Sequence, residues 1–167
     1  MNVQIRSAEP EDAAEIVAVL NPIILAGCYT SLDRPFELDE EHRFIAGFPK
    51  RGIFHVAEGE GSRIVGVQTV EPFATYTAAF DHVGVIGTYV ALDHRREGVG
   101  SQLFAATIQA AHGKGYEKLF SFIRADNPAA LAAYRKQGFE VIGIARQHAK
   151  IQGRYVDELM IEKLLLS

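Results

Sequence analysis

The most informative stretch of the chain reads VALDHRREGVGSQLF, from Val90 to Phe104. A β-branched, apolar run ends there in a turn with two arginines and two glycines, and an amphipathic helical pattern follows at once. Gly98 and Gly100 let backbone N–H groups approach an anion without obstruction by a side chain. These N–H groups lie at the start of the expected helix, where no intrahelical acceptor exists and the helix dipole favours negative charge. The pattern predicts a pyrophosphate-binding turn between a strand and a helix.

Two other kinds of phosphate loop do not fit this stretch. A dinucleotide fingerprint needs a third glycine at position 103, where the chain has Leu103. A P-loop needs Gly-Lys-Ser/Thr, and the chain has Gly100-Ser101-Gln102 instead. A Gly-x-Gly pair alone is equally compatible with a purely structural turn. The longer pattern Arg-x-x-Gly-x-Gly is more specific, because Arg95 and Arg96 add charge-assisted donors for a diphosphate.

Around this turn the chain alternates between strand and helix patterns. Strands are expected near residues 3–5, 53–57, 64–70, 82–92, 119–123, 141–145 and 155–161, where β-branched and aromatic residues concentrate. Helices are expected from Pro10, over 39–48, over 99–111 and over 127–138, whereas residues 21–37 are rich in turn formers and are expected to be irregular. The order β-α-α-β-β-β-α-β-α-β-β predicts an α/β (α+β mixed) architecture, a mixed sheet covered by helices.

Composition limits the class of protein. The 167 residues fit a single domain, 1–167, and 48% apolar with 23% charged residues predicts a sizeable core. A formal net charge of -4 argues against nucleic-acid binding, and the chain has no apolar run of the ~20 residues that span a membrane. Cys28 is the only cysteine, so no disulfide or Cys-rich zinc site is expected, and the six histidines show no metal-ligand spacing. We therefore expect a cytoplasmic protein without a metal; the first twelve residues reach charges too early for a signal peptide.

A second motif reads NPAALAAYRKQGF, from Asn127 to Phe139, and begins 27 residues after Gly100. Taken alone, it describes a capped, alanine-rich helix that ends in glycine and needs no function. Asn127 and Tyr134 are seven positions apart, close to two helical turns, so they share one side of the helix. The segment resembles the second signature of the GNAT acetyltransferases, Asn-x-x-Ala-x-x-x-Tyr-x-x-x-Gly-Phe. The Arg-x-x-Gly-x-Gly turn resembles the coenzyme A loop of the same family.

This resemblance extends over nearly the whole chain and implies a fold, an activity and a set of site residues. The fold would be a central mixed, mostly antiparallel sheet of about seven strands flanked by about four helices. The activity would be transfer of an acetyl group from acetyl-CoA to a primary amine, with acetyl-CoA as co-substrate. The implied coenzyme-binding residues are Tyr89 and Val90 beside the pantetheine arm, Arg95, Arg96, Glu97, Gly98, Val99, Gly100 and Ser101 around the pyrophosphate, and Asn127 and Tyr134.

Catalysis by such an enzyme needs a base and a group for the leaving sulfur. An alkylamine with a pKa near 10.4 costs about 4.6 kcal/mol to deprotonate at pH 7. The family's glutamate on the long central strand corresponds to Val83 here, so that role cannot be transferred; Glu71, with Asp81 and His82, is a nearby alternative. The resemblance places Tyr134 next to the sulfur, where a neutral phenol could protonate the thiolate. The alternative is that Tyr134 only packs in the core.

The sequence says less about the acceptor of the acetyl group than about the coenzyme. Arg34, in the expected loop over 21–36, could pair with a carboxylate and would then favour amino-acid-like acceptors, although an ordinary surface loop explains it equally well. The segment 151–158 resembles the small-molecule branch of the family, which includes phosphinothricin-type, amino-acid and polyamine acetyltransferases. Two other interpretations stay open, a protein N-terminal or lysine acetyltransferase and a non-catalytic acyl-CoA-binding regulator. Exposed strand edges would also allow a homodimer.

Overall fold

The computed structural model describes residues 1–165, which form one sheet of seven strands and four α-helices. The strands are β1 (Gln4–Ser7), β2 (Ile53–Glu58), β3 (Ile64–Pro72), β4 (Val83–Val90), β5 (Lys118–Arg124), β6 (Glu140–Ile151) and β7 (Arg154–Leu164). The helices are α1 (Ala13–Ala26), α2 (Leu38–Ala46), α3 (Val99–Gly113) and α4 (Pro128–Lys136). The sheet order is β1-β2-β3-β4-β5-β7-β6, and every neighbouring pair is antiparallel except β4 with β5. The predicted order of elements and the predicted fold class are confirmed.

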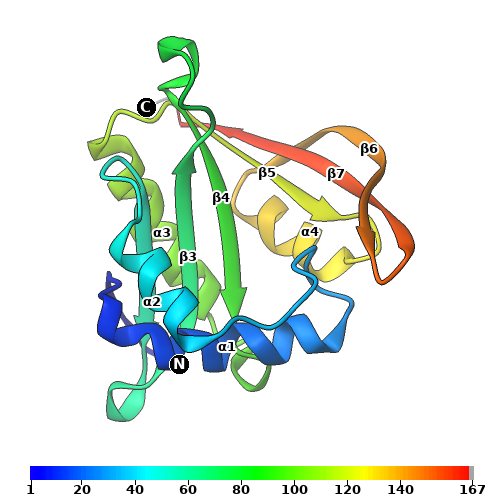
Figure 1. Ribbon diagram of the computed structural model, residues 1–167. Helices are drawn as coiled ribbons and strands as arrows, with labels where there is room; N and C mark the ends of the chain where they lie inside the picture. The colour runs from blue at the N-terminus through cyan, green and yellow to red at the C-terminus, as the bar shows by residue number, and fades with distance from the viewer. Residues whose placement is uncertain (166–167) are drawn as a thin grey trace.

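Helices lie on both faces of the sheet (Figure 1). Helices α1 and α2 pack on one face over β2 and β3, in a cluster that includes Ile16, Ile23 and Val67. Helices α3 and α4 pack on the other face, where Phe104 and Tyr134 join a second cluster. Gly66 on β3 lets the first turn of α3 come close, because a Cβ there would lie 3.0 Å from side chains of both Val99 and Leu103. The start of α3 is therefore held tightly against the sheet.

A gap opens between the two parallel strands. β4 and β5 pair only over Val83–Val85 with Lys118–Phe120, and beyond that point they diverge (Figure 1). The Ser121 hydroxyl of β5 donates to the carbonyl oxygen of Ile86 at 2.7 Å, close to where the strands separate. The C-terminal half of β4, residues 86–90, thus pairs with β3 on one side and faces the gap on the other.

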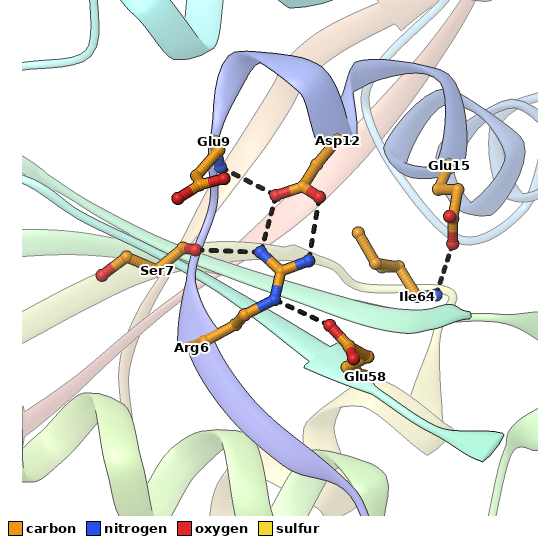
Figure 2. A network of polar contacts seen from close by, with 7 residues as sticks. All are labelled: Arg6, Ser7, Glu9, Asp12, Glu15, Glu58 and Ile64. Carbon is orange, nitrogen blue, oxygen red and sulfur yellow. Dashed lines mark hydrogen bonds and ion pairs between the residues drawn. The ribbon is translucent and has the colours of Figure 1, made fainter. Parts of the chain in front are cut away.

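An ion-pair network anchors the N-terminal strand and the start of α1 (Figure 2). Arg6 on β1 makes two hydrogen bonds to Asp12, at 2.8 and 2.9 Å, and a third to Glu58 on β2, at 2.7 Å. The Asp12 carboxylate also accepts from the backbone N–H of Glu9, and Glu15 of α1 accepts from the N–H of Ile64. The network fixes α1 against both β1 and the start of β3.

Three details differ from the sequence-based expectations. Residues 21–26 are helical, although the sequence predicts an irregular segment over 21–37, because Ile23 and Ile24 continue the buried stripe of α1 past Pro22. The helix ends at Gly27, whose φ of 75° a β-carbon would disfavour. Strands β6 and β7 are longer than expected and meet in a tight turn at Gln152 and Gly153, both with positive φ. β4 ends at Val90, and the chain then makes a short 3-10 turn over Leu92–His94.

Across residues 1–165, every helix is too short or too polar to cross a membrane.

Candidate active site

The N-terminus of α3 presents backbone donors that no side chain of the described residues caps. Its cap residue, Gly98, has a φ of 83°, in the left-handed region that suits glycine. By contrast, α4 is capped by Asn127, whose side-chain oxygen accepts from Ala130 N–H. A Cβ added to Gly100 would meet only Val90, at 3.9 Å, so the space above this residue is open. Uncapped amides under open space are suited to an anion such as a diphosphate.

The charged residues before α3 have different environments. Arg95 is half-buried, with its guanidinium stacked 4.0 Å from the ring centre of Tyr29. Arg96 is exposed, at a φ of 61°. The carbonyl of Glu97 accepts from the N-terminal amino group of Met1, which ties the turn to the start of the chain. Arg96 is therefore the arginine of the pair that is exposed toward solvent, while Arg95 also anchors the loop that carries Tyr29.

The C-terminal half of β4, residues 86–90, presents peptide groups to the gap. Phe73 N–H bonds to Val83 O and Ala91 N–H to Val65 O, so odd-numbered residues of β4 bond to β3. Even-numbered residues point the other way, as the bond from Ser121 to Ile86 O illustrates. Thr88 and Val90 thus direct their N–H and C=O groups into the gap, where an extended amide chain could pair with them. The predicted contacts of Val90 fit this register, whereas Tyr89 uses its backbone for β3 and has only its side chain available.

Tyr134 lies where the two strands separate. Its Oη is 2.9 Å from Thr88 Oγ1, and its ring makes edge-to-face contacts with Phe104 and Phe139, at centroid distances of 5.2 and 5.1 Å. Burial raises the pKa of Tyr134 to about 12, although hydrogen bonds with Thr88 and Ser121 oppose part of the rise. The phenol therefore stays neutral at every pH at which the protein would be assayed. The contacts of Phe104 and Phe139 fix the plane of the ring.

This raised pKa changes the role expected of Tyr134. A phenol whose pKa is raised by burial is a weaker acid than a free phenol, so complete proton transfer from Tyr134 to the departing thiolate is unfavourable. A phenol that keeps its proton can instead donate a strong hydrogen bond to the sulfur as negative charge develops there. The raised pKa of Tyr134 thus favours the role of a hydrogen-bond donor over that of a formal acid.

The candidate bases lie at different distances from Thr88 along the sheet. Glu71 is exposed on β3 opposite Val85, about 10 Å along the strands from Thr88. Burial raises the pKa of Tyr89 and the charge of Glu71 adds a little to the rise, and the register places the two side chains on the same face of the sheet. Asp81 and His82 precede β4 at the end where it pairs with β5, about 20 Å along the strand from Thr88. Of the three candidates, Glu71 thus lies nearest to Thr88 along the sheet, and Asp81 and His82 lie at the far end of β4.

The loop after α1 is fastened across the open end of the gap (Figure 1). Arg124 at the end of β5 is buried and donates to the carbonyls of Gly27 and Thr30, at 3.0 and 3.2 Å. Asn127 donates to Tyr29 O at 3.2 Å, and Ser31 donates to Glu158 at 2.8 Å. Arg34, further along the loop, instead forms an exposed pair with Glu40, at 2.7 Å.

Sequence reasoning missed Arg124, Thr88 and Glu158. Each acts through a partner that is distant in the chain, so no local pattern distinguishes it; Arg124 and Gly27 are 97 positions apart. Within residues 1–165, His, Cys, Asp and Glu side chains form no cluster of three or more that could hold a metal ion.

Comparison with known proteins shows the family of the chain. Residues 5–160 match the model of the acetyltransferase (GNAT) domain family, so the chain belongs to the GNAT acetyltransferases. The L-methionine sulfoximine/L-methionine sulfone acetyltransferase of Pseudomonas paraeruginosa is 26% identical over 163 residues, 94% of this chain and 91% of that protein. The phosphinothricin N-acetyltransferase of Streptomyces coelicolor is 25% identical over 166 residues, 98% of this chain and 96% of that protein. A crystal structure of ribosomal-protein-alanine N-acetyltransferase from Brucella melitensis superposes with a TM-score of 0.89 at 29% identity, covering 96% of this chain and 99% of the other.

Proposed function

We propose that this acetyltransferase moves an acetyl group directly from acetyl-CoA to the primary amine of a small molecule. The observation that carries the proposal is the uncapped N-terminus of α3, open above Gly100 and next to the gap that holds Tyr134. Gly98, Val99, Gly100, Ser101 and Arg96 would hold the diphosphate, with Arg95 at the edge of that site. The peptide groups of Thr88 and Val90 would pair with the pantetheine arm, and Asn127 would support the site by holding Tyr29.

In the proposed reaction the amine nitrogen attacks the thioester carbon, a C–N bond forms and the C–S bond breaks. The nitrogen releases one proton, and the sulfur leaves as the thiol of coenzyme A once it has gained a proton. Tyr134 would donate a hydrogen bond to the sulfur while charge develops there. Glu71, on the face that carries Tyr89, would take the amine proton through a water molecule.

The preference for a small acceptor rests on the loop Gly27–Ser31. Arg124, Asn127 and Glu158 hold this loop in place, and we infer that a held loop beside the gap suits a small acceptor better than a protein chain. The resemblance to methionine sulfoximine and phosphinothricin acetyltransferases supports the same class of acceptor. The 29% identity to a ribosomal-protein-alanine acetyltransferase makes a protein N-terminus the second candidate. We further propose a single cytoplasmic domain that can pair as a homodimer.

The test is release of free thiol from acetyl-CoA in the presence of single acceptors. The panel should contain L-methionine sulfone, phosphinothricin, free amino acids, polyamines and a peptide with an N-terminal alanine. We expect thiol release and an acetylated product with a small amine, and little with the peptide. Turnover confined to the peptide would overturn the choice of acceptor, and a protein that fails to bind coenzyme A would overturn the whole proposal.

A further inference from the structure

A row of polar side chains crosses the sheet beneath α3 and ends at Tyr134. Gln68 on β3 and Thr88 on β4 are cross-strand neighbours, and Gln68 Nε2 donates to Thr88 Oγ1 at 2.9 Å. The same hydroxyl oxygen lies 2.9 Å from Tyr134 Oη. Gln68 is 0% exposed, although it carries an amide among apolar neighbours. Burial of an amide requires hydrogen bonds that offset its desolvation, so this row needs an explanation.

The direction of each hydrogen bond in the row follows from its donors. The amide nitrogen of Gln68 can only donate, so Thr88 Oγ1 accepts at that contact. Among the side chains of residues 1–165, the other partner of the Thr88 hydroxyl is the Tyr134 phenol. We therefore infer that the Thr88 hydroxyl donates its single proton to Tyr134 Oη. The proton of the phenol must then point away from Thr88.

Ser121 on β5 is a second hydroxyl near the phenol. Its hydroxyl donates to the carbonyl oxygen of Ile86 at 2.7 Å, and a carbonyl can only accept. Toward Tyr134 the Ser121 oxygen is therefore an acceptor. Ser121 lies on β5, so a phenol proton that points away from Thr88 on β4 would be shared between Ser121 and any acceptor bound in the gap.

We infer that Gln68 and Thr88 are positioning residues that turn the proton of Tyr134 away from Thr88 and so make it available to the sulfur of coenzyme A. The inference rests on the proposed function, which places the sulfur in this gap. The other end of the Gln68 amide agrees with it, because Oε1 is buried and has no hydrogen-bond partner in the described part of the chain. An amide whose oxygen is left unpaired in the core is present for its donor end.

The inference can be tested with coenzyme A alone, without an acceptor. The pKa of the bound thiol is measured from thiolate absorbance across a pH series, with desulfo-coenzyme A as the ligand that lacks the sulfur. The Thr88→Val variant keeps the shape of the side chain and removes the hydroxyl, whereas Thr88→Ser keeps the hydroxyl. We expect Thr88→Val to raise the pKa of the bound thiol by about one unit, a tenfold loss of thiolate at a given pH, and Thr88→Ser to match the wild type. Affinity for desulfo-coenzyme A is measured for each protein as the reference, so that a change at the sulfur is separated from a change in binding of the rest of the coenzyme.

A second variant, Gln68→Glu, is designed to reverse the direction of the hydrogen bonds from residue 68 through Thr88 to Tyr134. A carboxylate at position 68 offers no donor, so in Gln68→Glu the Thr88 hydroxyl would donate to it and the phenol would turn its proton back to Thr88. We expect the same rise of the thiol pKa as in Thr88→Val; if the buried carboxylate prevents folding, Thr88→Val alone decides. A wild-type thiol pKa in Thr88→Val, together with a raised one in Tyr134→Phe, would overturn the inference and leave the role of Tyr134 intact. An unchanged thiol pKa in Tyr134→Phe would show that the phenol does not contact the sulfur and would overturn the inference as well, whereas no binding of coenzyme A would overturn the proposed function itself.

Discussion

Replacing Gly100 by alanine should make the protein more stable and bind coenzyme A more weakly. Gly100 is the second residue of α3, and its φ is outside the left-handed region. A Cβ there would meet only Val90, at 3.9 Å, which is ordinary van der Waals contact. The fold therefore does not require glycine at this position. Alanine is the better helix former by about 0.5–1 kcal/mol, so the melting temperature should rise by about 1–4 °C.

The affinity should change in the opposite direction. The added methyl group would occupy the open space above the first turn, where the diphosphate would approach the amides of α3. Loss of one hydrogen bond from an amide to a charged group costs about 1.5–3 kcal/mol, which corresponds to about ten- to a hundredfold weaker binding. Gly113 at the other end of α3 supplies the matched control, because a Cβ added there would have no atom within 4 Å and would lie far from the turn.

Thermal unfolding without ligand and calorimetric titration with coenzyme A measure both effects in the same samples. Gly113→Ala should keep wild-type affinity, whereas Gly100→Ala should lose it. If Gly100→Ala bound coenzyme A as tightly as the wild type, the diphosphate could not lie against the start of α3. If Gly100→Ala were instead less stable without ligand, the reasoning about its free space would be wrong.

Three further outcomes are expected. Tyr134→Phe should lower kcat about tenfold or more while the Kd of coenzyme A changes little, as measured by thiol release and calorimetry; an unchanged kcat would remove the phenol from the reaction. Arg6→Met should lower the free energy of unfolding by about 1–2 kcal/mol in urea titrations. Arg34→Met removes an exposed ion pair and should have no measurable effect. Equal effects would show that the Arg6 pair stabilises the fold no more than the exposed Arg34 pair does. The Arg6 side chain holds the pKa of Asp12 below its ordinary value, so this stabilisation is complete above about pH 4 and is lost as the pH falls further. The difference between Arg6→Met and the wild type should therefore shrink below about pH 4, and a constant difference would show that the Asp12 charge is not involved.

The parts of the site that could be predicted from the sequence are those that local chemistry defines. Gly98 with Gly100 marks the start of a helix that can accept an anion, and Asn127 with Pro128 marks a helix cap whose helix carries Tyr134. These signals depend on residues within one or two turns of each other. The fold class also follows from local patterns, because a given order of strands and helices allows few arrangements.

What could not be predicted depends on contacts between distant parts of the chain. Thr88 is ordinary in its strand and becomes important only because Tyr134, 46 positions later, lies beside it. Arg124 would pass for a surface arginine, yet it is buried beneath a loop that precedes it by more than ninety positions. The sequence predicts an irregular segment from residue 21, but α1 continues through Pro22 to Ala26. Burial of Ile23 and Ile24 outweighs the local cost of Pro22 to the helix.

The position of the bound coenzyme decides whether the proposed site is right, and backbone amide shifts report that position directly. Isotope-labelled protein should be titrated with coenzyme A and followed by heteronuclear NMR. The largest changes should appear at the amides of Gly98–Ser101 and at Thr88 and Val90, with small changes on α2 and β1. Changes concentrated away from the start of α3, for example on α2 or β1, would contradict the proposed diphosphate site.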